Sequence, residues 1–91
     1  MTNSAELIAR NGVLVINDTA ENVVDSASYY VSEDTVIARI EINGDDTTDV
    51  LASYVSTPAT AVKGGVLITP QNGAYFSAIT LTSGSVVAIL K

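Results

Sequence analysis

The sequence predicts an all-β fold, either a small antiparallel sandwich or a jelly-roll-like barrel, and three observations support this prediction. The β-branched residues Val, Ile and Thr number 30 of 91, and their side chains suit the pleated surface of a strand better than a helix. Groups of Asn, Asp, Gly, Pro and Ser separate short apolar runs at short intervals, which is typical of sandwiches and barrels. The clearest runs alternate in polarity with a period of two. The length fits one domain, residues 1–91.

Two strands are expected before residue 32. The first is the short apolar run 12–16. Residues 22–31 contain the second, which runs through Tyr29 and Tyr30. Successive side chains of a strand point to opposite faces, so one tyrosine ring would face inward and the other outward. The outward ring is either an interface anchor, a role in which Tyr is enriched, or an ordinary exposed side chain.

The third expected strand, residues 35–42, is half-buried because its apolar side chains alternate with polar ones. One face of this strand would carry Val36, Ala38, Ile40 and Ile42, and the other Ile37, Arg39 and Glu41.

Helix is expected in two short segments. Residues 48–54 form a helical turn capped by Asp49, and residues 5–10 form a short N-terminal helix.

The C-terminal third contains the remaining expected strands. Residues 66–69 form a short one, and residues 74–82 form a longer, alternating one. The final strand, residues 85–90, follows after the two-residue step Ser83-Gly84. Because Gly tolerates positive φ, this step predicts a tight C-terminal β-hairpin in which the last two strands pair.

Charge divides the chain into two unlike halves. All ten acidic residues lie at or before Asp49, so residues 1–49 carry −8, whereas residues 50–91 hold only Lys63 and Lys91 and carry +2. Interface centres are depleted of charge, so the second half is either a surface buried against protein or the Ser/Thr-rich outer face of a sheet. A chain this short also has little core of its own, and its 47% hydrophobic and 15% charged residues favour oligomerisation.

Composition excludes several classes of function. The sequence contains 0 His and 0 Cys, which rules out Ser–His and Cys–His catalysis, disulfides and the common zinc sites. The net charge of −6 argues against nucleic acids and anionic membranes as partners. The longest apolar run is too short to span a bilayer. The polar N-terminal stretch predicts no signal peptide, and therefore synthesis in the host cytoplasm.

The acidic residues gather in two turn-like clusters, Glu33-Asp34 and Asp45-Asp46-Asp49. Paired carboxylates can hydrolyse glycosides, but few aromatic residues are available to form a sugar platform. The loop 43–49 offers oxygen ligands for Ca²⁺ without the spacing of an EF-hand, so we favour a β-turn followed by a helix cap. Lys63 would act as a base only if buried, and the adjacent Gly64-Gly65 indicates an exposed turn. We therefore expect no catalytic residues, no metal and no cofactor.

The last third of the sequence, residues 61–90, resembles the C-terminal ending of short proteins encoded among bacteriophage structural genes. The resemblance rests on a glycine-bearing turn, the strand-like segment 76–81, a Ser-Gly turn at 82–85 and a last strand at 86–89. The chain departs from that pattern at its end, where Ile89-Leu90-Lys91 stands in place of an expected aromatic residue. The resemblance implies a virion component without catalytic activity, a trimer that decorates the capsid or joins a fibre to it.

Two functions follow as expectations. The first is a non-enzymatic phage virion structural protein, a capsid decoration, cement or head-fibre-associated protein that binds copies of itself and a major capsid or other virion protein. The alternative is a small β-sheet module that recognises a sugar or a peptide. The residues expected at the self-association interface are Tyr75, Phe76, Ile79, Leu81, Val87 and Ile89.

Overall fold

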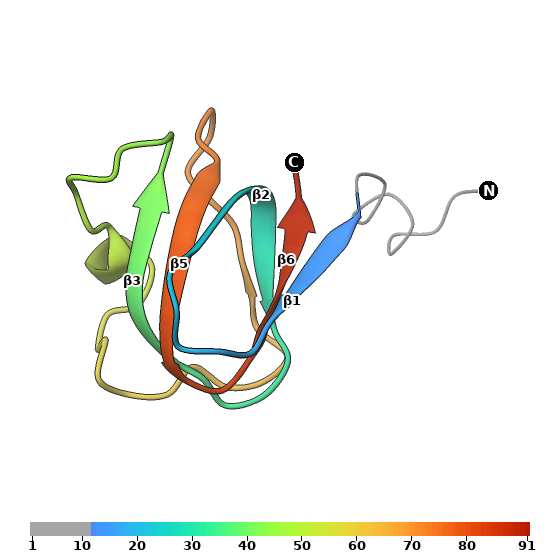
Figure 1. The fold of residues 1–91 in the computed structure, drawn as a ribbon. Helices are drawn as coiled ribbons and strands as arrows, with labels where there is room; N and C mark the ends of the chain where they lie inside the picture. Colours follow the sequence, from blue (N-terminus) through green and yellow to red (C-terminus); the bar gives the residue numbers. More distant parts are fainter. Residues whose placement is uncertain (1–11) are drawn as a thin grey trace.

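The computed structural model describes residues 12–91, which form an antiparallel sheet of six strands (Figure 1). This confirms the predicted all-β class. The helix expected at residues 5–10 lies outside the described residues. No helix in the described part of the chain has the length and apolar character needed to cross a membrane. In chain order the elements are β1 (Val13–Ile16), β2 (Asn22–Val31), β3 (Val36–Ile42), the 3-10 helix η1 (Leu51–Ser53), β4 (Leu67–Ile68), β5 (Phe76–Ser83) and β6 (Val86–Leu90).

The long strand β2 connects the two halves of the sheet. The strand order is β1-β6-β2-β5-β3, and β4 also pairs with β2. The first part of β2 pairs with β5, where Val23 lies opposite Ala78, and the last part pairs with β6. The register shifts on both sides of Ser26, and such bulges bend a strand and increase its twist. The sheet therefore curls at β2, with β3 and β5 on one side of the molecule and β1 and β6 on the other (Figure 1).

The predicted C-terminal hairpin is wrong. Both segments are strands, but β2 lies between β5 and β6 in the sheet, so the last two strands do not pair. The turn between them instead crosses the β2–β3 connection, where Ser85 N donates to Thr35 Oγ1 at 3.0 Å. The Thr35 hydroxyl is also 2.8 Å from Glu33 O, to which it donates. Both β5 and β6 are largely buried. The strand β2 pairs with β5 along one of its edges and with β6 along the other.

The strand predicted at residues 35–42 exists, but its simple alternation does not. Ile37 lies opposite Leu81 and Arg39 opposite Thr80, so Ala38 is an extra, bulged residue. The bulge reverses the phase of the side chains, which buries both Ile37 and Ile40 while Ala38 is exposed. The predicted apolar face of this strand is therefore divided between two faces.

A second bulge explains the burial of β5. Between the pairs that join Ala78 to Glu41 and Phe76 to Ile42, Ser77 is the extra residue. The shift allows Phe76 to reach the same core as Ile79 on this strand, although strict alternation would place their side chains on opposite faces.

The core is organised around aromatic rings. Tyr29 stacks on Phe76 with ring centroids 4.5 Å apart, and Tyr54 meets the Phe76 ring edge-on at 5.3 Å. Leu51 of η1 is also buried, as the predicted helical turn required. Tyr29 is 0% exposed and Tyr30 is 42% exposed, which confirms that one adjacent tyrosine faces inward and the other outward. Burial strongly raises the pKa of Tyr29.

Candidate interaction surface

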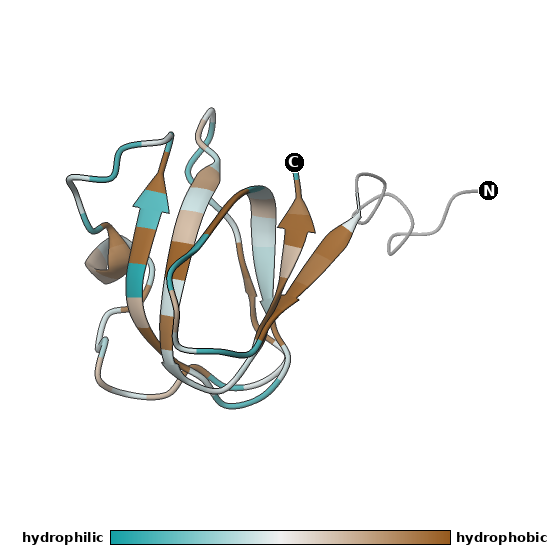
Figure 2. Ribbon diagram, in the orientation of Figure 1, coloured by the Kyte–Doolittle hydropathy of each residue, from teal (hydrophilic) through white to brown (hydrophobic). Residues whose placement is uncertain are grey.

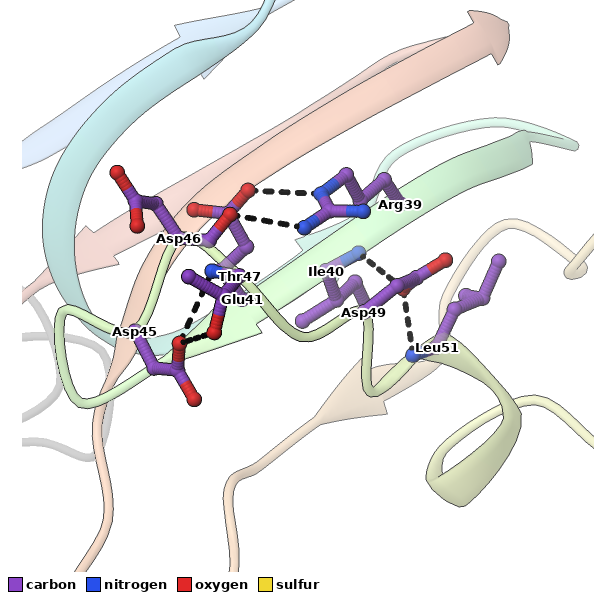
Figure 3. A network of polar contacts seen from close by, with 8 residues as sticks. All are labelled: Arg39, Ile40, Glu41, Asp45, Asp46, Thr47, Asp49 and Leu51. Atoms are coloured by element: carbon purple, nitrogen blue, oxygen red, sulfur yellow. Dashed lines mark hydrogen bonds and ion pairs between the residues drawn. The ribbon is translucent and has the colours of Figure 1, made fainter.

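The acidic loop 43–49 uses its side chains to hold its own shape (Figure 3). Asp45 Oδ1 accepts hydrogen bonds from Thr47 N at 2.9 Å and Thr47 Oγ1 at 2.6 Å, and these bonds lower the pKa of Asp45. Asp49 Oδ1 accepts from Leu51 N at 2.9 Å, at the start of η1. These contacts are those of a turn followed by a helical start, as favoured from the sequence. The residue at the N-cap position of η1 is Val50, however, and not the predicted Asp49.

The same loop is attached to β3 by an arginine. Arg39 Nε donates to Glu41 Oε2 at 2.7 Å, and Arg39 Nη2 donates to Asp46 O at 3.2 Å (Figure 3). Glu41 is only 5% exposed, so its charge is paired where water has little access. Within residues 12–91, no group of three or more acidic side chains is placed to hold a metal ion.

The second acidic pair, Glu33 and Asp34, joins two connections that are distant in sequence. Asp34 accepts from Gly64 N at 3.2 Å and from Lys63 Nζ at 3.4 Å, and these contacts lower the pKa of Asp34. Glu33 Oε1 accepts from Ser85 Oγ at 3.0 Å. Lys63 is exposed, as the adjacent glycines predicted, and its contact with Asp34 is a surface ion pair.

The interface residues predicted from the sequence require a correction. Phe76, Ile79 and Leu81 are 0–1% exposed and belong to the core, and Ile89 is 6% exposed. A folded chain cannot present these four side chains to a partner, because they are buried within the chain itself. Tyr75 and Val87 are half-buried, and the Lys91 ammonium group lies 4.5 Å from the centre of the Tyr75 ring.

The exposed apolar side chains instead form a row across four strands. Val15 on β1 lies opposite Val87 on β6, Val87 lies opposite Tyr30 on β2, and Tyr30 lies opposite Leu67 on β4. Residues directly opposite in antiparallel strands share a face of the sheet. Val13, two residues before Val15, belongs to the same face. We call these five residues the outer face.

The opposite side of the same strands is the core. Ile16 lies opposite Val86 and Val86 opposite Val31, and all three are at most 1% exposed. The outer face therefore points away from the core, although its members are as apolar as those inside. Figure 2 shows hydrophobic colouring along β1 and β6, whereas hydrophilic positions interrupt β3.

The outer face is exposed and uncharged. Val15 is 58% exposed, Leu67 46% and Tyr30 42%. Together with Val13 and the half-buried Val87 they form a continuous apolar patch, and exposed apolar patches often mark contact sites. This surface can bind a complementary apolar surface of another protein.

The sequence prediction placed the contact surface in residues 50–91, but the outer face draws on both halves of the chain. Leu67 and Val87 come from the second half, whereas Val13, Val15 and Tyr30 come from the first. One signal for it was present in the sequence: the run 13–16 has no charge, and no polar residue interrupts it. Its pairing with β6 and β2 depends on contacts between distant residues, which the pattern does not encode.

Comparison with known proteins finds no matching family model, no matching curated protein and no matching solved structure.

Proposed function

We propose that this chain is a non-enzymatic structural protein of a bacteriophage-type virion, a capsid decoration, cement or head-fibre-associated protein. It assembles with copies of itself and with the major capsid protein or another virion protein, after synthesis in the host cytoplasm. The outer face carries this proposal. An uncharged apolar surface on a chain with net charge −6 has the composition of an interface centre, and water is a poor environment for it.

The distribution of charge supports a division between a contact side and a solvent side. The acidic loop 43–49 follows β3 and is bonded to it, and β3 is at one end of the strand order while β1 is at the other. The negative loop therefore belongs to the end of the sheet away from β1. A negative solvent side keeps such a protein soluble and opposes unlimited aggregation.

The proposal is tested by asking whether the chain is part of a particle. Phage particles from a lysate that expresses the gene are purified by two rounds of density banding, and their proteins are quantified by mass spectrometry. We expect many copies of the chain per particle after the second round. A chain found only in the soluble fraction would contradict a virion role.

Two matched variants test whether incorporation into the particle depends on the outer face. Tyr30→Asp places a charge at the centre of the row and should prevent incorporation, because burying an unpaired charge in an interface is costly. Val23→Asp is the control, since Val23 is 74% exposed on the same strand but lies outside the row. Binding of the purified chain to a glycan or peptide array through Tyr30, without incorporation into particles, would favour the binding module instead.

A further inference from the structure

Strand β1 presents backbone hydrogen-bonding groups at the end of the sheet. Among the described strands it pairs only with β6. Leu90 N donates to Gly12 O at 3.0 Å, which fixes the phase of the ladder, since hydrogen-bonded pairs alternate along antiparallel strands. The register then makes Leu14–Ala88 and Ile16–Val86 hydrogen-bonded pairs. The N–H and C=O groups of Val13 and Val15 therefore point away from β6.

The free edge of β3, at the other end of the sheet, is covered by the chain itself. On β3, Ile40 N donates to Asp49 Oδ1 at 3.1 Å and Ile40 O accepts from Val50 N at 2.8 Å, so the chain's own loop covers that edge (Figure 3). Proteins usually protect exposed edges with charges, prolines or bulges. The β1 sequence Val-Leu-Val-Ile contains none of these devices.

Leu14 gives a second reason to expect a neighbour for β1. It lies opposite Ala88, which in turn lies opposite Tyr29, and both of these residues are completely buried. Leu14 therefore points to the core side of the sheet, yet it is 40% exposed. Leu14 is therefore only partly covered at this edge.

We infer that β1 pairs antiparallel with β1 of a second copy of this chain, about a two-fold axis that passes beside Leu14. This inference rests on the proposed self-assembly and specifies its contact. Val13 of each copy lies opposite Val15 of the other, so the two strands exchange four backbone hydrogen bonds. The two Leu14 side chains face each other, and each covers the exposed part of the other.

A second copy fits this edge better than an unrelated chain for two reasons. Antiparallel pairing of identical strands is complementary by symmetry, because each donor meets the corresponding acceptor. Two chains of net charge −6 repel each other, but neither β1 nor the outer face carries a charge, so approach at this edge is the least unfavourable. Pairing also joins the two outer faces into one longer apolar stripe.

Disulfide trapping tests the register directly, because the chain has no cysteine of its own. In Leu14→Cys the two sulfur-bearing residues would form a non-hydrogen-bonded pair with Cα atoms about 4.5 Å apart, within the range that a disulfide accepts. We expect Leu14→Cys to form a covalent dimer under mild oxidation about tenfold faster or more than Val23→Cys, because pairing raises the effective concentration of the two thiols. Equal rates for the two variants would overturn the pairing.

Charge complementation and copy number complete the test. Leu14→Lys alone and Leu14→Glu alone should each reduce association, whereas an equimolar mixture should restore it, because opposite charges then face each other. Circular dichroism checks that both variants remain folded. Folded variants that stay apart when mixed would contradict the register.

Light scattering gives the number of copies in the assembly. Two copies support β1 pairing. Three copies overturn β1 pairing but agree with self-assembly and with the trimer that the resemblance implies. One copy at every concentration in a chain that is incorporated into particles overturns the pairing but not the virion role.

Discussion

At the scale of single residues, Gly84 controls how β5 passes to β6. Its φ is +89°, and a Cβ atom at this position would lie 2.7 Å from both Asp34 O and Thr35 Cα. Both atoms belong to the backbone and cannot move aside easily. Gly73 has a similar φ of +86°, but a Cβ atom there would have no neighbour within 4 Å. Substitutions at these two glycines therefore distinguish the cost of backbone strain from the cost of steric overlap.

We predict that Gly84→Ala lowers the free energy of unfolding by about 2–5 kcal/mol, the sum of strain at positive φ and overpacking. Gly73→Ala should cost about 1 kcal/mol, because only the strain applies. Urea denaturation of both variants measures the difference. Equal losses would mean that the crossing of the 83–85 turn over Thr35 is not as tight as described.

The adjacent tyrosines and the bulges show what residue patterns can and cannot predict. Strand geometry alone correctly predicts that one of the adjacent residues Tyr29 and Tyr30 faces inward and the other outward, without saying which. The joint burial of Ile37 with Ile40 on β3, and of Phe76 with Ile79 on β5, was not predicted. It results from the bulges at Ala38 and Ser77, which depend on the register between β3 and β5. One extra residue changes which face every later side chain occupies.

At the scale of elements, the sequence located the strands far better than it paired them. Alternation and turn residues are local properties, and they correctly predicted strands near residues 12–16, 35–42 and 74–82. Pairing depends on which edges remain available after the whole chain folds. The step at Ser83-Gly84 satisfied the local requirements of a hairpin, but β2 occupies the edges that a hairpin would have used. The predicted interface was wrong for four residues that are buried, whereas Val87 does lie on the outer face; the buried four are Phe76, Ile79, Leu81 and Ile89.

Two carboxylates in the loops should make the stability of the fold sensitive to acid. The pKa values of Asp34 and Asp45 are both lowered in the folded protein, so their hydrogen bonds contribute stability above the pKa of an unfolded Asp, about 3.9. This contribution is lost as the pH falls from about 4 through the folded pKa values. We expect the melting temperature to fall over this range, and less steeply in Asp45→Asn. A melting temperature unchanged on acidification would contradict the role of these carboxylates.

The two faces of the sheet should respond differently to charge. Ile79→Asp buries an unpaired carboxylate in the core, where the wild-type side chain is 1% exposed, and should unfold the domain. Val87→Asp changes a half-buried side chain on the outer face, so the fold should survive while incorporation into particles is lost. Circular dichroism and particle proteomics measure the two effects. A folded Ile79→Asp variant would mean that the core assignment of β5 is wrong.

At the scale of the whole molecule, a curled sheet, an uncharged outer face and an unpaired strand edge together favour assembly with other chains. Acidic loops stabilise the end of the sheet at β3, and the apolar strands β1 and β6 form the opposite side. A short domain without disulfides gains stability by covering such a surface with another chain. Assembly is therefore the property on which the proposed role depends.

The most direct measurement is multi-angle light scattering of the purified full chain over a wide concentration series, beside Leu14→Lys. We predict that the wild type passes from one copy to two as concentration rises, because β1 pairing follows mass action. Leu14→Lys should remain at one copy with an unchanged circular dichroism spectrum, since like charges would face each other across the axis. A wild-type chain that is well folded and remains at one copy at every concentration would contradict the self-assembly on which this account rests.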